Sequence, residues 1–109
     1  MQRLNVRDFT LFPGPRYIKL GEYSGEWFRE KVLIPLIKSD TCIILDLDGV
    51  AGYGSSFLEE AFGGAVRKGI DTDILFGIID NIISKDDPDL IEEIRGYVND
   101  AIKVKKDAN

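Results

Sequence analysis

Histidine is absent from the 109 residues of the chain, and cysteine occurs only once, at position 42. The absence of histidine removes the usual general base and the commonest neutral metal ligand, so we expect no catalytic residues, no metal site and no cofactor. An intrachain disulfide is excluded, because it needs two cysteines. Cys42 lies in the apolar run 42–45, which predicts a buried, small side chain without a role in function.

Long apolar runs are also missing, and acidic residues outnumber basic ones. No stretch approaches the length of a membrane-spanning helix, and the first residues lack the apolar core of a signal peptide, so we expect a cytoplasmic protein that binds no membrane. Lysine and arginine number 14 against 19 aspartate and glutamate, which gives a net charge of -5. This charge repels a phosphate backbone, so we expect no binding to nucleic acid.

The length and composition predict one folded domain. A chain of 109 residues, 44% hydrophobic and 30% charged, suits a single core. No internal repeat or linker divides the sequence. We assign residues 1–102 to this domain and expect the polar tail, residues 103–109, to be frayed.

The hydrophobic pattern predicts a mixed α/β domain. Apolar runs indicate strands in four segments, of which the second is the weakest: residues 4–10, 16–20, 41–48 and 78–83. Residues 41–48 are nearly all apolar, as expected of a central strand that is covered on both faces. Residues 71–76 fit a short helical turn. The predicted fold class is therefore α/β, with a mixed sheet of about four strands packed with helices.

Two helices are marked by their end signals. The first begins near Glu26 with Ser24 as its N-cap, and Pro35 should kink this helix or break it into two pieces. The last helix follows Asp87 and Pro88, which fit an N-cap and a proline at the first helical position.

The clearest helix follows the glycine-rich turn 49–54. Its apolar residues form one stripe: Phe57, Leu58, Ala61, Phe62, Ala65 and Val66. Glu59, Glu60 and Arg67 lie opposite the stripe, and we expect Glu59 or Glu60 to be exposed.

The serines and glycines of this helix carry further predictions. Ser56 and Glu59 match the Ser-x-x-Glu capping box, although Ser55 also fits the N-cap position. Gly63 and Gly64 weaken a helix, so we expect them to permit the close approach of a neighbouring element or of a partner.

The segment 46–58 resembles the strand-turn-helix signature of STAS domains, the anti-sigma factor antagonists. The shared pattern is Asp-Leu-x-Gly-Val at residues 46–50, followed by Ser-Ser-x-Leu at residues 55–58. In those antagonists the second serine is phosphorylated, and it corresponds to Ser56. The chain departs from the antagonist pattern at two positions. It has Gly54 where the antagonists often carry an acidic residue, and Phe57 where they carry a glycine.

A closer resemblance, to the bacterial STAS-like domain family of unknown function, extends over nearly the whole chain. It rests on four blocks, of which the last is the most specific: residues 12–17, 23–26, 33–35 and 52–64. This resemblance implies a small STAS-like fold and, by analogy with the antagonists, a non-catalytic regulatory domain that binds a protein. The partner suggested by the analogy is a histidine-kinase-like ATPase that phosphorylates Ser56 or Ser55.

Two interpretations of the serines stay open, because capping alone also explains serine at these positions. In the regulatory interpretation, six residues would contact the partner: Tyr53, Gly54, Glu59, Glu60, Gly63 and Gly64. Arg16 lies in a loop bounded by prolines, where it either pairs with a carboxylate or an anion or is simply exposed.

A rival hypothesis starts from Asp46 and Asp48. Residues 44–50 resemble the first motif of haloacid-dehalogenase-type phosphatases, in which two aspartates lie beside Mg²⁺. Those enzymes also need a lysine and further carboxylates on later strands, whereas the candidates here all fall within residues 85–87. The alternative function is a small Mg-dependent phosphatase-like or ligand-binding domain that uses Asp46 and Asp48.

Overall fold

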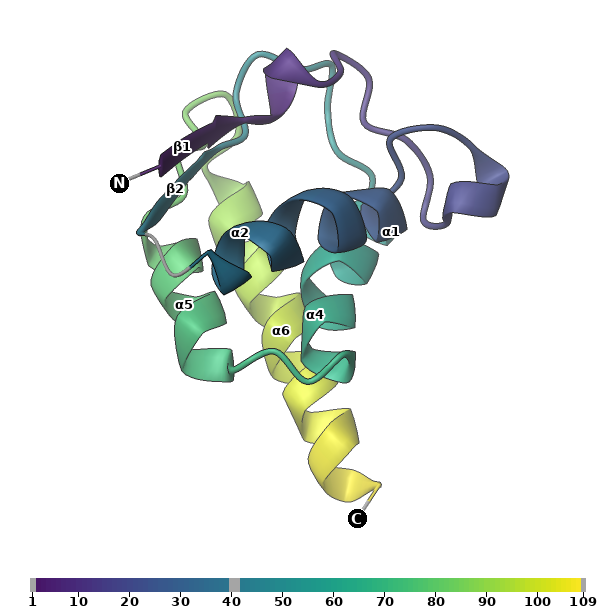
Figure 1. Cartoon of the computed structure of the whole chain (residues 1–109), viewed down its shortest axis with the longest axis vertical. Helices are drawn as coiled ribbons and strands as arrows, with labels where there is room; N and C mark the ends of the chain where they lie inside the picture. Colours follow the sequence, from purple (N-terminus) through teal and green to yellow (C-terminus); the bar gives the residue numbers. More distant parts are fainter. Residues whose placement is uncertain (1, 40–41, 109) are drawn as a thin grey trace.

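The computed structural model describes residues 2–39 and 42–108, which form helices beside a small parallel sheet (Figure 1). Strands β1 (Gln2–Asn5) and β2 (Ile43–Asp46) pair in parallel. Ile83 adds a single bridge to the other side of β2, since its amide donates to the Leu45 carbonyl at 2.8 Å. Within the described residues the sheet therefore has two strands, and the expectation of about four is wrong.

The missing strands have local explanations. Residues 16–20 end in a 3₁₀ turn, η2 (Ile18–Leu20), and another such turn, η1 (Val6–Asp8), ends the first strand at Asn5. Thr41, the expected start of the central strand, lies outside the described residues.

Residues 78–80 of the expected strand 78–83 belong to helix α5 (Thr72–Asp80), and of the other three residues only Ile83 pairs with β2. The Asp71 carboxylate caps α5, accepting hydrogen bonds from the amides of Asp73 at 2.8 Å and Ile74 at 3.4 Å. The helix then buries its apolar residues at helical spacing: Leu75, Ile78 and Ile79. The cap at Asp71 thus outweighs the β-branched residues that suggested a strand.

The first long helix consists of three consecutive parts: α1 (Gly25–Trp27), the π-helical stretch η3 (Phe28–Leu33) and α2 (Ile34–Lys38). Ser24 is confirmed as its N-cap, because the Ser24 Oγ accepts a hydrogen bond from the Trp27 amide at 3.0 Å. Pro35 has no amide hydrogen, and the hydrogen bonding changes from π to α at Ile34, just before it. The change at Ile34 lies where an irregularity was expected from Pro35.

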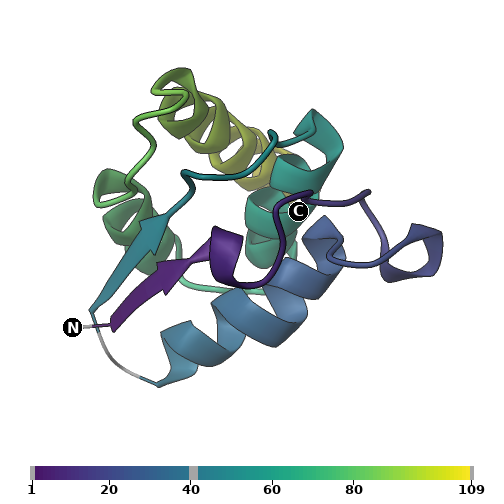
Figure 2. The same ribbon diagram turned by 90° about the horizontal axis from the view of Figure 1, so that it is seen from above.

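The second long helix also has a π-helical centre: α3 (Ser55–Leu58), η4 (Glu59–Gly63) and α4 (Gly64–Arg67). The predicted apolar stripe is confirmed, because each of its six residues is at most 2% exposed. Ser56 lies in the first turn of this helix. The two long helices pack against each other (Figure 2). They approach closely at Gly25, where a side chain would overlap the backbone carbonyl of Phe57.

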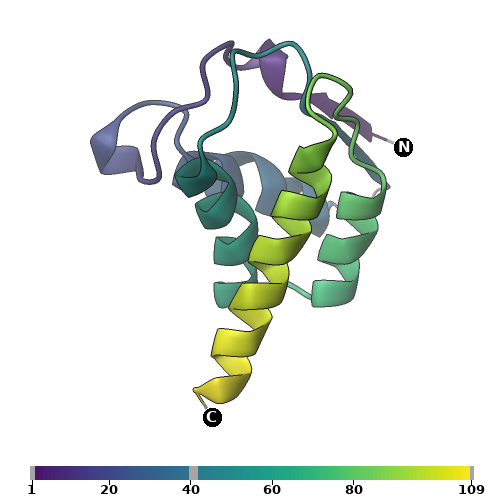
Figure 3. The same ribbon diagram turned by 180° about the vertical axis from the view of Figure 1, so that it is seen from behind.

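The last helix, α6 (Asp89–Asp107), packs beside α4 and α5 (Figure 3). It starts one residue later than expected, with Pro88 at the N-cap position and no side-chain cap. It also continues through residues 103–107, the stretch that the sequence analysis assigned to the tail. Lys105 and Lys106 in the last turn favour this extension, because they face the negative end of the helix dipole.

The core lies between the sheet and the helices, and Cys42 does not belong to it. Ile43 and Leu45 are buried, whereas Cys42 is exposed. Successive strand residues point to opposite faces, so the position that precedes Ile43 turns outward. In residues 2–39 and 42–108, no helix has both the length and the apolarity needed to cross a membrane.

One segment stands away from this core. Residues 9–23, which we call the projecting loop, extend sideways beyond α1 (Figures 1 and 3). The loop returns to the body of the domain at Ser24, which is fully buried.

Candidate functional site

The candidate site is centred on Ser55 and Ser56, which are both exposed at the start of the second long helix. Gly54 occupies the N-cap position with an extended backbone, and no side chain caps this helix. The predicted capping box between Ser56 and Glu59 is therefore wrong. Glu59 binds arginine side chains instead of the backbone.

The two serines differ in their contacts. Ser55 lies near Tyr97 of α6, whose hydroxyl donates to Glu93 at 2.7 Å. Burial and the Glu93 carboxylate raise the pKa of Tyr97 to about 12, so this phenol stays protonated at neutral pH. Among the described residues, Ser56 has no side-chain hydrogen-bond partner.

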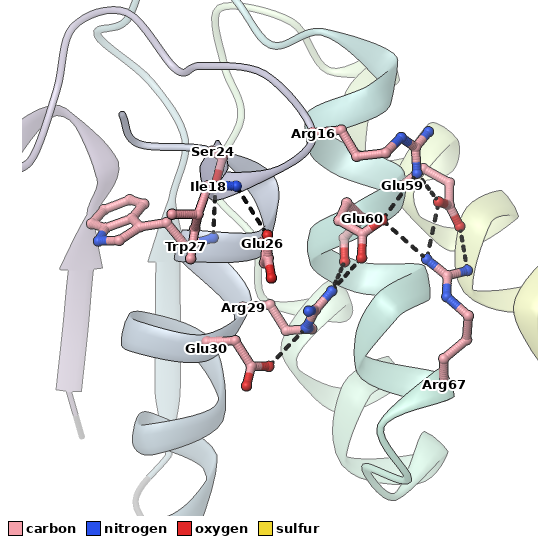
Figure 4. A network of polar contacts seen from close by, with 10 residues as sticks. All are labelled: Arg16, Ile18, Ser24, Glu26, Trp27, Arg29, Glu30, Glu59, Glu60 and Arg67. Atoms are coloured by element: carbon pink, nitrogen blue, oxygen red, sulfur yellow. Dashed lines mark hydrogen bonds and ion pairs between the residues drawn. The ribbon is translucent and has the colours of Figure 1, made fainter. Parts of the chain in front are cut away.

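One turn further along, Glu59 and Glu60 bind three arginines (Figure 4). We call this set of five residues the arginine–glutamate network. Arg16 reaches in from the projecting loop, and its Nη1 lies 2.5 Å from Glu59 Oε1 and 3.2 Å from Glu60 Oε1. Arg67 binds both oxygens of Glu59, at 2.8 and 3.1 Å. Of the two possibilities for Arg16, pairing with a carboxylate is the one observed.

The inner part of the network is a buried ion pair between the two long helices. Arg29 Nη1 lies 2.5 Å from Glu60 Oε2, and the two side chains are only 5% and 9% exposed. The same guanidinium donates to the Glu60 carbonyl at 3.0 Å and to Glu30 at 2.8 Å. Such a pair tolerates burial because both charges are compensated and hydrogen-bonded.

The network favours the ionised form of Glu59. Hydrogen bonds from Arg67, opposed by burial and reinforced by Arg16, lower the pKa of Glu59 below its ordinary value. The same contacts correct the expectation that Glu59 or Glu60 is exposed, since Glu59 is half-buried and Glu60 is buried. Burial of Glu60 is possible because Arg29 lies directly opposite it.

Gly63 and Gly64 are both buried, so neither offers an outward surface to a partner. A side chain at Gly63 would overlap the Glu59 carboxylate, and one at Gly64 would overlap the Arg29 guanidinium. The glycines do permit close approach, but of the network within the domain. Gly63, Gly64 and Glu60 are therefore removed from the predicted partner surface.

Tyr53 and Gly54, the other predicted contact residues, differ in orientation. The Tyr53 hydroxyl donates to the Leu47 carbonyl at 2.8 Å, and its ring lies 5.7 Å from that of Phe57. Burial, with the nearby charges of Asp46 and Asp48, raises the pKa of Tyr53. Tyr53 is half-buried and fixes the turn, while Gly54 is exposed.

The two aspartates of the rival hypothesis are engaged by protein groups. Asp46 is 3% exposed and pairs with Arg3 at 2.5 Å and Arg7 at 3.1 Å. Although burial opposes ionisation, hydrogen bonds from the Asp48 amide and from these arginines lower the pKa of Asp46. The Asp48 carboxylate accepts hydrogen bonds from the amides of residues 85 and 86, at 3.1 and 2.9 Å. In the described part of the chain, no cluster of acidic or cysteine side chains is arranged to hold a metal ion.

Arg29 is the functional-site residue that the sequence analysis missed. It follows Phe28 in a helix and precedes the buried Val32 and Leu33, so its position on the inner face was readable from the apolar spacing. The acidic pair at positions 59 and 60, followed by two glycines, was the matching signal on the second helix.

Comparison with known proteins places these features in a family. A family model described as a STAS-like domain of unknown function (DUF4325) matches residues 24–87. The matched segment contains both long helices, β2 and the two serines, whereas the projecting loop and α6 lie outside it. No curated protein and no solved structure matches the chain.

Proposed function

Since the chain belongs to the family of STAS-like domains of unknown function, we propose that it is a regulatory domain that binds a protein and is switched by phosphorylation of Ser56. The observation that carries this proposal is the position of Ser56. It is exposed in the first turn of a helix whose opposite side is part of the core. A kinase can therefore reach the hydroxyl while the domain stays folded.

The contacts favour Ser56 over Ser55 as the modified residue. A phosphate on Ser55 would lie near Tyr97 and the Glu93 carboxylate to which Tyr97 donates, and the two negative charges would repel each other. The resemblance to the antagonists supports the same choice, because the second serine is the one modified there. Ser56 is therefore the residue that we propose as the switch.

A phosphate on Ser56 would act on the arginine–glutamate network. It adds a charge of about −1.5 to −2. Glu59 and Glu60 follow Ser56 at the spacing that makes helical side chains neighbours. The phosphate would repel these carboxylates and attract Arg16, which binds both of them. Because Arg16 belongs to the projecting loop, the modification would change how this loop is held.

The proposed partner is a protein kinase of the histidine-kinase-like ATPase class, by analogy with the antagonists. We expect this kinase to dock on the exposed residues Gly54, Ser55 and Ser56. The half-buried Glu59 borders this surface. A kinase that docks here would contact the residue that it modifies.

Mass spectrometry of the protein purified from its native organism tests the proposal. We expect a fraction of the chain to carry one phosphate, located at Ser56. The phosphate should disappear in Ser56→Ala and persist in the matched variant Ser55→Ala. A chain that is never phosphorylated under any growth condition, or that is phosphorylated equally in Ser56→Ala, would show that Ser56 is not the switch.

A further inference from the structure

The projecting loop carries most of the large apolar side chains that the domain leaves exposed. Those with at least 40% exposure in the loop are Phe9, Leu11, Phe12, Tyr17, Ile18 and Leu20. Phe12 and Leu20 reach 73% and 63%. Scattered exposed leucines are ordinary in soluble domains, whereas apolar residues gathered in one segment are typical of a binding surface.

A cleft of about 620 Å³ lies on one side of this loop. Its apolar walls are the side chains of Ile18, Leu20, Tyr23 and Trp27. Trp27 joins the cleft to the rest of the loop, because its ring lies 5.0 Å from that of Tyr23 and 5.6 Å from that of Phe9. Tyr23 has a φ of 53°, a left-handed conformation that is uncommon for a bulky residue and is often found at binding sites.

The loop is anchored by hydrogen bonds at its base. The amides of Gly25 and Glu26 donate to the carbonyls of Pro15 and Arg16, both at 2.9 Å. The Glu26 carboxylate accepts a hydrogen bond from the Ile18 amide at 2.9 Å (Figure 4). A cleft that is formed in advance binds with a smaller entropy loss than a loop that must order itself.

The charge around the cleft is opposite to that of the chain. Lys19 and Lys31 line it, with Glu22 as the one acidic residue among its lining residues. Ion pairs in residues 2–39 and 42–108 are all formed by arginines, so neither lysine has a carboxylate as an ion-pair partner. The Lys19 ammonium lies 5.8 Å from the centre of the Tyr17 ring. The net charge of the whole chain is -5, so this cationic rim is a local feature.

We propose that this cleft binds an acidic amphipathic segment of a protein partner, one that combines large apolar side chains with aspartate or glutamate. The apolar side chains would cover Leu20 and Trp27, and the carboxylates would pair with Lys19 and Lys31. Aromatic residues in a preformed cleft are the usual anchors of such interfaces. Two lysines on an acidic chain do not suit a nucleic acid or an anionic membrane, which both need denser positive charge. This site does not depend on the modification of Ser56.

Selection from a random peptide library displayed on phage, followed by fluorescence, tests the proposal. Trp27 is the only tryptophan of the chain, so its emission reports on the cleft directly. We expect enriched peptides to contain acidic and large apolar residues and to shift this emission in a saturable manner. Affinity should fall at least tenfold in Lys19→Glu/Lys31→Glu and stay unchanged in the matched control Lys103→Glu/Lys106→Glu on α6.

A second variant separates binding from folding. Leu20→Ser removes an exposed side chain, so it should keep the melting temperature and lose at least fivefold in peptide affinity. The proposal is overturned if no peptides or only basic ones are enriched. It is equally overturned if Lys19→Glu/Lys31→Glu binds normally, or if single-stranded RNA or phosphatidylserine vesicles shift the emission more strongly than the peptides do.

Discussion

Two regions of the domain differ in the side chains that they bury and expose. One is the interface between the two long helices, and the other is the projecting loop. The interface buries charged groups, namely Arg29 and Glu60, and gives each of them a partner. The projecting loop exposes apolar groups such as Phe12 and Leu20, and leaves them uncovered. Burying a charge and exposing an apolar side chain are both unfavourable in free energy. Each arrangement therefore indicates a role other than stabilising the fold. We expect the paired charges to determine how the helices meet, whereas the uncovered apolar groups remain accessible to a partner.

The family match follows the same division. It covers residues 24–87, which contain the buried ion pair and both serines, and it leaves the projecting loop outside. Arg16 joins the two regions, because it belongs to the loop and binds Glu59 and Glu60. Substitutions in the two regions should therefore differ in their effect on stability.

The largest loss of stability is expected when one member of the buried pair is removed. Glu60→Ala leaves the Arg29 charge buried without its partner, which should lower the free energy of unfolding by about 3–5 kcal/mol. Replacing both residues, as in Arg29→Met/Glu60→Leu, should recover much of this loss. Urea denaturation measures both values. A loss below about 1 kcal/mol for Glu60→Ala would mean that the pair does not fix the helix interface.

The close helix contact can be tested with a pair of glycines. Gly25→Ala places a methyl group against the Phe57 backbone and should destabilise the domain by about 1–3 kcal/mol. At Gly77, on the exposed side of α5, only the adjacent residues and the backbone of the helix itself lie within 4 Å of the place that a Cβ would take, so Gly77→Ala should stabilise the domain by about 0.5–1 kcal/mol. Thermal unfolding of the two variants gives the comparison, and equal effects would contradict the proposed contact.

Acid should weaken the arginine–glutamate network. The pKa of Glu59 is lowered in the folded state from its ordinary value of 4.5. A carboxylate with a lowered pKa stabilises the fold above its unfolded pKa, and this contribution is lost as the pH falls through the folded pKa. The free energy of unfolding should therefore fall below about pH 4.5, and less steeply in Glu59→Gln. The pH dependence of urea denaturation measures both slopes, and identical slopes would contradict the prediction.

The smallest effect on stability is expected in the projecting loop. Leu20→Ser should change the free energy of unfolding by no more than about 0.5 kcal/mol, because the side chain is already exposed. Leu58, which is 0% exposed, is the matched core position, where Leu58→Ala should cost about 2–5 kcal/mol. Comparable losses at the two positions would mean that the loop belongs to the core.

The sequence predicted those features that depend on local spacing. The stripe from Phe57 to Val66 and the cap at Ser24 were confirmed, because helical periodicity and capping are properties of neighbouring residues. The segment 78–83 was misjudged, since the same β-branched residues suit a strand or a buried helix. The helix there begins at the cap formed by Asp71, which lies outside the segment 78–83 and was not considered when that segment was predicted as a strand.

The candidate site was predictable only in part. Ser55 and Ser56 were correctly placed at the start of a helix. The inward position of Gly64 could not be predicted from its own helix, because the side chain that it faces is Arg29, more than 30 residues earlier in the chain. Contacts between distant segments leave no periodic signal in either of them.

The central claim is that a phosphate on Ser56 attracts the Arg16 guanidinium. NMR of the arginine side chains tests this claim most directly. Phosphoserine is incorporated at position 56 and, as the matched control, at position 39, the exposed residue that directly follows α2. We predict that the Arg16 Nε–Hε resonance moves with phosphoserine at position 56 and stays in place with phosphoserine at position 39. An Arg16 resonance that is the same in both modified proteins would contradict the claim.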